Sequence, residues 1–194
     1  MTNEIVCVGD SITGWRTRSK NKNDWPLKTY PEMLEKILQE KKYNFQIINE
    51  GYPGELAENS YSRVSEALAS YPQAKYFIVL FGTNDVEDNP HRIQEISDTI
   101  LTSLGSSVEK IREKEKIPIL MTIPKIFGEQ QFTNYNRIIE LTNDRIITYC
   151  NKQKIKLIDI SSKLSAKYFA DGIHPNEEGA RLIAKEVYKG LSKF

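Results

Sequence analysis

Near its N-terminus the chain reads Ile5-Val6-Cys7-Val8-Gly9-Asp10-Ser11-Ile12-Thr13, four apolar residues that run directly into a glycine, an aspartate and a serine. A short apolar run with such an abrupt polar end predicts a buried strand that presents the Ser11 hydroxyl at its carboxyl end. In open α/β sheets, ligands bind outside the carboxyl ends of the strands. We therefore expect Ser11 to lie at a binding or catalytic edge.

The rest of the chain alternates strands with helices. Apolar runs predict five strands, at Glu4–Gly9, Phe45–Asn49, Lys75–Phe81, Ile117–Thr122 and Lys156–Ile160. Apolar residues at helical spacing predict helices at Tyr30–Lys42, Leu56–Ala69, His91–Lys114, Asn134–Lys152 and Glu177–Ser192. This alternation predicts a right-handed, doubly wound parallel sheet with helices on both faces. We expect one three-layer α/β domain spanning residues 1–194.

The composition is that of an ordinary globular domain. Of the 194 residues, 39% are hydrophobic and 27% are charged, and the formal charge is +1. This balance gives no reason to expect nucleic acid or a membrane surface as a partner. No apolar run approaches the roughly 20 residues that a membrane span needs, and no secretory signal precedes the first strand. We therefore expect a cytoplasmic location.

The cysteines and histidines do not indicate a metal site. Cys7 and Cys150 both fall in segments that we expect to be buried, which favours reduced thiols over a disulfide. The two histidines are far apart in the sequence, so no metal-ligand spacing arises. We expect neither a metal nor a cofactor.

Polar or glycine-rich clusters follow the predicted strands. After Ser11 come Asn49–Gly54 behind the second strand, Gly82–Asp85 behind the third, and Asp171–Pro175 between the fifth strand and the last helix. Because the carboxyl ends of parallel strands share one edge of a sheet, we expect these clusters to converge there.

These clusters contain the groups that acyl transfer needs. A serine hydroxyl becomes a good nucleophile when a positioned base removes its proton, and the chain has only His91 and His174 to choose from. Asp171 precedes His174 by three residues, so a tight turn brings its carboxylate to the imidazole and orients it. The backbone N–H of Ser11, a glycine N–H of the second cluster and the Asn84 amide are candidate donors to an oxyanion.

Gly9-Asp10-Ser11, Gly54, Gly82-x-Asn84-Asp85 and Asp171-x-x-His174 resemble, in this order, the four blocks of the SGNH (GDSL-type) hydrolase family. The resemblance implies a flavodoxin-like sheet, a Ser11 nucleophile, a His174 base and an Asp171 that orients it. It also implies an oxyanion hole made by Ser11, Gly54 and Asn84. The second block departs from the pattern, since Gly54-Glu55-Leu56 stands where the family commonly has Gly-Asp-Thr or Gly-Asn-Thr. Gly51 is an alternative to Gly54.

Two segments are candidates for shaping a substrate site. The basic stretch Trp15–Lys28, which begins with the candidate contact residue Trp15, directly follows Ser11 and either rims the site or forms a solvated insertion. The stretch Ile123–Gly128 follows the fourth strand. Its Ile123 and Phe127 either line an acyl or alcohol pocket or pack beneath a long loop.

Taken together, these features predict a serine hydrolase that cleaves carboxylic esters through an acyl-enzyme. Its partner would be a small-molecule or carbohydrate ester. Alternatives within the family are a carbohydrate O-deacetylase, a thioesterase or a lysophospholipase. Outside catalysis, the alternative is a catalytically silent binding module that uses the same cleft. Taken alone, Ser11 also fits a helix N-cap, and Asn84 fits a turn former. The sequence does not specify the natural ester, because the loops that set specificity carry no transferable code.

Overall fold

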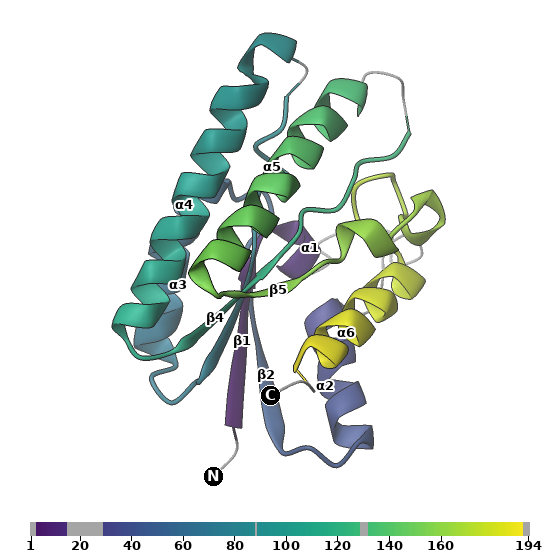
Figure 1. The fold of residues 1–194 in the computed structure, drawn as a ribbon. Helices are drawn as coiled ribbons and strands as arrows, with labels where there is room; N and C mark the ends of the chain where they lie inside the picture. Colours follow the sequence, from purple (N-terminus) through teal and green to yellow (C-terminus); the bar gives the residue numbers. More distant parts are fainter. Residues whose placement is uncertain (1–2, 15–28, 88, 129–131, 192–194) are drawn as a thin grey trace.

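Five parallel strands form one sheet through the middle of the molecule, in the order β2-β1-β3-β4-β5 (Figure 1). The strands are β1 (Asn3–Gly9), β2 (Phe45–Gly51), β3 (Tyr76–Leu80), β4 (Ile117–Met121) and β5 (Lys156–Ile158). The computed structural model describes residues 3–14, 29–87, 89–128 and 132–191. The predicted α/β fold with a five-stranded parallel sheet is confirmed, and its strand order is the flavodoxin-like one.

The helices cover the sheet in two layers. One layer consists of α1 (Ser11–Gly14), α2 (Tyr30–Glu40) and α6 (Glu177–Leu191). The other consists of α3 (Ser60–Ser70), α4 (Ile93–Glu113) and α5 (Phe132–Gln153). Short 3₁₀ turns complete the described elements, at η1 (Ala57–Asn59), η2 (Pro90–Arg92), η3 (Ser161–Lys163) and η4 (Ala166–Tyr168).

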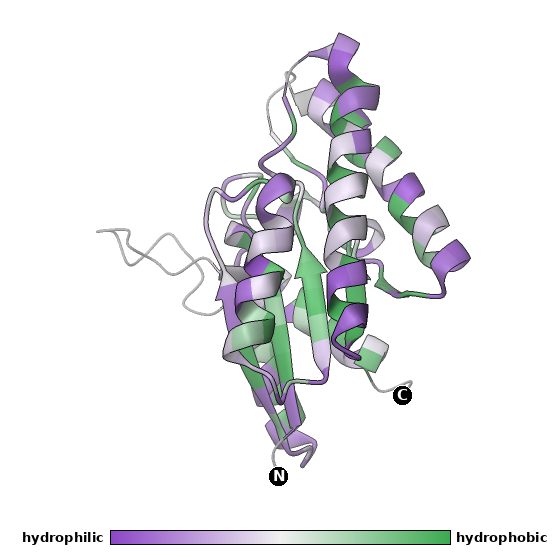
Figure 2. Ribbon diagram, turned by 90° about the vertical axis from the view of Figure 1, so that its left-hand side faces the viewer, coloured by the Kyte–Doolittle hydropathy of each residue, from purple (hydrophilic) through white to green (hydrophobic). Residues whose placement is uncertain are grey.

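Each inner strand is apolar on both faces, as a strand buried between two helical layers must be. In β1, Val6 and Val8 pack toward α3, α4 and α5, while Ile5 and Cys7 pack toward α2 and α6. The alternation repeats in β3 and β4, so the sheet separates two hydrophobic cores. Figure 2 shows the hydrophobic strands between helices whose outer surfaces are hydrophilic.

The ends of several elements differ from the prediction for local reasons. The helix predicted from Leu56 begins as η1 and becomes α-helical only at Ser60. The fifth strand ends at Ile158 and not at Ile160, because the backbone N–H groups of Ile160 and Ser161 donate to Thr122 Oγ1. The predicted end of the last helix, at Ser192, lies outside the described residues.

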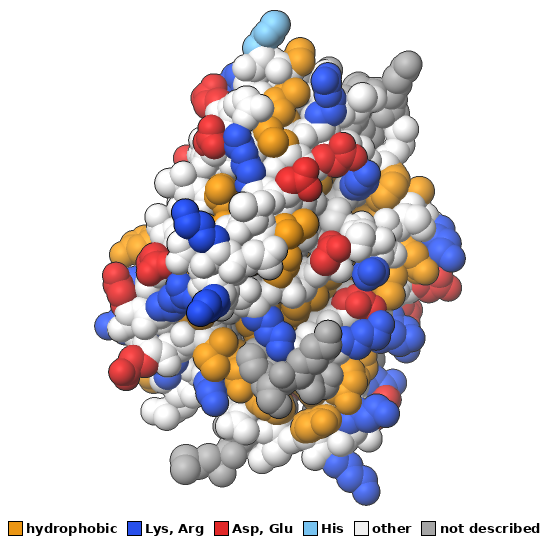
Figure 3. All heavy atoms as spheres, viewed as in Figure 1, with side chains coloured by type: hydrophobic (Ala, Val, Ile, Leu, Met, Phe, Trp, Pro, Cys, Tyr) orange, Lys and Arg blue, Asp and Glu red, His pale blue; other side chains and the backbone are white. Residues whose placement is uncertain are grey.

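The surface carries both signs of charge. On the face seen in Figure 3, Lys and Arg side chains are intermixed with Asp and Glu side chains. Within the described ranges, no helix is both long enough and apolar enough to cross a bilayer.

Candidate functional site

A continuous chain of hydrogen bonds joins Ser11, His174 and Asp171 at the carboxyl edge of the sheet. Ser11 Oγ lies 3.0 Å from His174 Nε2, and His174 Nδ1 lies 2.8 Å from Asp171 Oδ2. Ser11 and His174 are 163 positions apart in the sequence, so the fold itself brings them together. A hydroxyl on one ring nitrogen and a carboxylate on the other is the arrangement that activates a serine.

The short helix α1 holds Ser11 at its first position. The Asp10 carbonyl accepts the N–H groups of Thr13 and Gly14, and Asp10 Oδ1 accepts the N–H of Ile12 at 2.9 Å. Asp10 thus caps the helix with both its backbone and its side chain. This capping fixes the position of Ser11 relative to the end of β1.

A tight turn holds the other two groups. Asp171 Oδ1 accepts the backbone N–H groups of Ile173 and His174, at 2.9 and 2.7 Å, which leaves Oδ2 for the imidazole. Gly172 has φ +88°, and a Cβ there would collide with the Phe127 carbonyl oxygen. Glycine is required at this position for both reasons. Phe127 N–H in turn donates to Gly172 O at 2.8 Å, so the loop after β4 braces the turn.

The electrostatics of this turn favour an ionised Asp171. Burial raises the pKa of its carboxyl, but the hydrogen bonds from His174 and Ile173 outweigh that effect, so the pKa lies below its ordinary value. The carboxylate is therefore charged at neutral pH and able to stabilise an imidazolium at His174.

Asn84 and Gly54 come from neighbouring loops that are bonded to each other. Asn84 Nδ2 donates to the Glu55 carbonyl at 2.9 Å, which orients the amide beside the loop that carries Gly54. An amide has two N–H donors, and no second acceptor for Asn84 occurs among the residues described. Gly54 is exposed, with φ +84° and open space where a Cβ would be. Both groups have the exposure that a donor to a substrate needs.

Gly51, the alternative to Gly54, has a different role. Its N–H donates to Asn49 Oδ1 at 3.0 Å, and a Cβ at Gly51 would collide with the backbone of Gly14. The glycine at position 51 therefore allows the end of β2 to pack against α1. The geometry favours Gly54 as the candidate oxyanion donor.

Of the three candidate substrate contacts, the structure describes Ile123 and Phe127. Trp15, with the rest of Trp15–Lys28, lies outside the described residues. Ile123 has no exposed surface and packs in the core against Gly82, which fits the alternative in which this segment packs beneath a loop. The side chain of Phe127 is half-buried, and its ring centre lies 5.0 Å from that of Phe169. Phe169 forms a β-bridge with Pro175, the residue after His174.

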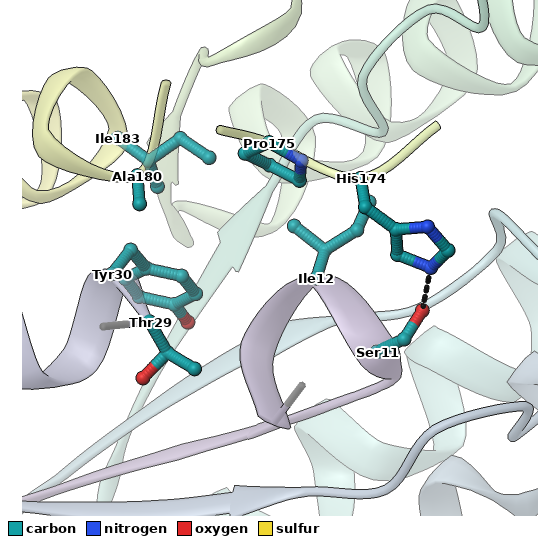
Figure 4. Close-up of a pocket in the computed structure, with 8 residues that line it drawn as sticks. All are labelled: Ser11, Ile12, Thr29, Tyr30, His174, Pro175, Ala180 and Ile183. Carbon is teal, nitrogen blue, oxygen red and sulfur yellow. Dashed lines mark hydrogen bonds between the residues drawn. The ribbon is translucent and has the colours of Figure 1, made fainter. Parts of the chain in front are cut away.

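A small recess opens beside Ser11 and His174. Figure 4 shows both side chains at one end of it and α2 and α6 on the opposite side. Its remaining lining is Ile12, Thr29, Tyr30, Pro175, Ala180 and Ile183. This lining is mainly apolar. No cluster of side chains that could hold a metal ion occurs in the described part of the chain.

The sequence did not single out Asp10 as a buried charge. Its side chain has no exposed surface, and its Oδ2 forms no hydrogen bond within the described ranges. Burial raises the pKa of Asp10 to about 7, although the hydrogen bond from the Ile12 N–H acts in the opposite direction. With a pKa of about 7, the Asp10 carboxyl of the folded protein is protonated below neutral pH.

Asp10→Asn is expected to change how stability depends on pH. The folded protein holds a proton on Asp10 between pH about 4 and 7 that the unfolded chain releases, so the stability of the wild type falls as pH rises through this window. The variant lacks this fall. Its unfolding free energy minus that of the wild type should therefore grow from pH 4.5 to 7 and then level off, as measured by urea unfolding.

Asp159→Asn is the control of opposite sign. Burial raises the pKa of Asp159, but hydrogen bonds from Ser162 and Thr122 bring it below the ordinary value. This carboxylate stabilises the fold above its ordinary pKa, and the contribution is lost as pH falls. Identical pH dependence in the wild type and Asp10→Asn would contradict the assignment to Asp10.

Comparisons with known proteins identify the family of the chain. A model of the GDSL-like lipase/acylhydrolase family matches residues 7–182. No match among curated protein sequences reached significance.

Several solved structures share the fold. A lipolytic protein of the G-D-S-L family from Veillonella parvula is 20% identical with a TM-score of 0.74, over 100% of both chains. An acetylxylan esterase from Geobacillus stearothermophilus is 19% identical with a TM-score of 0.75, over 97% of this chain and 94% of that one. A GDSL-like lipase from Bacteroides thetaiotaomicron is 18% identical with a TM-score of 0.70, over 98% and 88%. At these identities the likeness concerns the fold.

Proposed function

Because the chain belongs to the GDSL-like lipase/acylhydrolase family, we propose that it hydrolyses carboxylic esters through an acyl-enzyme formed on Ser11. The observation that carries the proposal is the hydrogen-bonded sequence of Ser11 Oγ, His174 and the Asp171 carboxylate. A serine that serves only as a helix cap has no need of an imidazole at 3.0 Å that is itself oriented by a carboxylate.

In the acylation step, Ser11 Oγ attacks the ester carbonyl carbon while its proton passes to His174 Nε2. The carbonyl oxygen becomes an oxyanion that accepts hydrogen bonds from the Ser11 N–H, the Gly54 N–H and the free N–H of the Asn84 amide. When the tetrahedral intermediate collapses, the bond to the alcohol breaks and His174 gives its proton to the leaving oxygen.

Deacylation runs through the same groups with water in place of the alcohol. His174 Nε2 removes a proton from water, the hydroxide attacks the acyl carbon, and the proton returns to Ser11 Oγ as the acid departs. Asp171 keeps its negative charge throughout, holds the Nδ1–H tautomer and stabilises the imidazolium.

The substrate class can be identified by testing a panel of esters. The acetylxylan esterase among the fold neighbours makes acetylated xylo-oligosaccharides a natural first test. They are to be compared with phenyl acetate, an acyl thioester and a lysophospholipid. The proposal predicts turnover of phenyl acetate and of at least one other class. Binding of a panel member without turnover of any would instead indicate the silent binding module.

Asn84→Ala is expected to lower kcat by about 10²–10³ with little change in KM, since the oxyanion exists only in and near the transition state. Kinetics with phenyl acetate measure both constants. The matched control is Asn89→Ala in the same β3–α4 connection, where Asn89 Oδ1 caps His91 N–H at 3.1 Å. The control should lose stability and retain kcat. Equal kcat in the two variants would remove Asn84 from the oxyanion hole.

A further inference from the structure

The loop that carries Gly54 is held by a charged network on the side of α3. The Glu55 carboxylate pairs with Arg63 through Nη2 and through Nε, the latter at 3.1 Å, and accepts Asn59 Nδ2 at 2.6 Å. The side chains of Arg63 and Glu55 are only 26% and 15% exposed. The pair is therefore shielded from solvent, unlike an ordinary surface ion pair. The Arg63 pair keeps the pKa of the Glu55 carboxyl below its usual value, although burial alone would raise it.

Arg63 also contacts the residues that precede Gly54. Its guanidinium carbon lies 3.9 Å from the centre of the Tyr52 ring, a cation–π arrangement. The Tyr52 hydroxyl donates to Glu50 at 2.8 Å, and Tyr71 donates to the other Glu50 oxygen at 2.7 Å. One guanidinium thus joins Tyr52, two residues before Gly54, to Glu55, the residue after it.

Gly54 has no side chain that could pack against a neighbour, and a Cβ at its position would meet no atom within 4 Å among the described residues. The position of its N–H therefore depends on the residues on either side of it. The neighbouring residues Tyr52 and Glu55 also bond to the segments that carry the other two donors, Ser11 and Asn84. Tyr52 N–H donates to the Gly9 carbonyl at 2.8 Å, two residues before Ser11, and the Glu55 carbonyl accepts Asn84 Nδ2 at 2.9 Å.

We propose that Arg63 is a positioning residue for the ester hydrolysis proposed above, on which this inference rests. It holds the loop between Tyr52 and Glu55 so that the Gly54 N–H and the Asn84 amide both point to the place where the oxyanion forms. Preorganised donors stabilise a transition state because they need not reorient during the reaction. Loss of Arg63 therefore weakens two donors without removing either.

The test is Arg63→Met, which keeps the aliphatic stem and removes the guanidinium. We expect kcat for phenyl acetate to fall by on the order of 10²-fold, with KM within about threefold of the wild type. The matched control is Arg145→Met, because Arg145 is also 26% exposed and pairs with Asp98 at 2.7 Å between α4 and α5. Its kcat should stay that of the wild type.

A second readout separates positioning from general loss of stability. If Arg63 acts through the oxyanion donors, Arg63→Met should cost much less in an Asn84→Ala background than in the wild type, whereas a general loss of stability would cost the same in both. Binding of a trifluoromethyl ketone, which forms an oxyanion on the enzyme, should weaken by the same factor as kcat/KM falls. Glu55→Gln breaks the same pair from the loop side and should reproduce the pattern if Arg63→Met does not fold.

Failure of this inference is distinguishable from failure of the proposed function. A kcat within threefold of the wild type in Arg63→Met and Glu55→Gln, with Ser11→Ala inactive, overturns only the role of Arg63. Equal losses in the wild-type and Asn84→Ala backgrounds do the same. Hydrolysis that survives Ser11→Ala, or a wild type that cleaves no ester, overturns the proposed function and the inference with it.

Discussion

Ser11→Ala is expected to lower ester turnover by on the order of 10⁴-fold or more and to leave the fold intact. The substitution removes the oxygen on which the proposed acyl-enzyme forms, while the backbone N–H of residue 11 and the remaining proposed donors stay in place. Initial rates with phenyl acetate measure the loss, and circular dichroism with thermal unfolding checks the fold. Because Ser11 Oγ bonds only to His174 among the described residues, its removal should cost little stability.

The matched control for this variant is Ser97→Ala. Ser97 is a buried serine of α4 whose Oγ has no hydrogen-bonding partner in the described ranges, so it tests the loss of a buried hydroxyl away from the site. The control should hydrolyse phenyl acetate at the wild-type rate. Residual activity in Ser11→Ala above about one hundredth of the wild type would place the nucleophile elsewhere.

Asp171→Asn is expected to lower kcat by about 10⁴, the cost of holding an imidazole in the wrong tautomer. The Asn Oδ1 can still accept the N–H groups of Ile173 and His174, so its amide nitrogen must face His174 Nδ1. Two donors cannot face each other, and Nδ1 therefore loses its hydrogen. The proton moves to Nε2, which can then no longer accept the proton of Ser11.

His91→Ala is the control for the choice of base. His91 is exposed on η2, and its backbone N–H is capped by Asn89. Its removal should leave kcat unchanged. A kcat for Asp171→Asn within tenfold of the wild type, or a rate lost on replacing His91, would mean that His174 is not the base.

Much of the fold could be predicted from the sequence because its strongest signals are local. Runs such as Tyr76–Leu80 are apolar on both faces, which fits only a strand buried between two layers. The Asp171–His174 spacing describes one turn, and the structure contains that turn with its expected hydrogen bond.

The features that the sequence could not reveal depend on contacts between segments that are far apart in the sequence. The choice of Gly54 over Gly51 depends on Gly14 of α1. The backbone of Gly14 lies so close to Gly51 that a Cβ at position 51 would collide with it. The burial of Ile123 depends on its contact with Gly82. The pairing of Glu55 with Arg63 crosses eight positions, and nothing in the residue pattern distinguishes it from the many surface ion pairs of the chain.

The most direct test of Ser11 as the nucleophile is to label the protein with a fluorophosphonate, which phosphonylates activated serines, and to locate the adduct by peptide mass spectrometry. We expect one adduct, on the peptide that contains Ser11, with labelling lost in Ser11→Ala and strongly slowed in Asp171→Asn. An adduct on another residue, or labelling of undiminished rate in Ser11→Ala, would contradict this assignment.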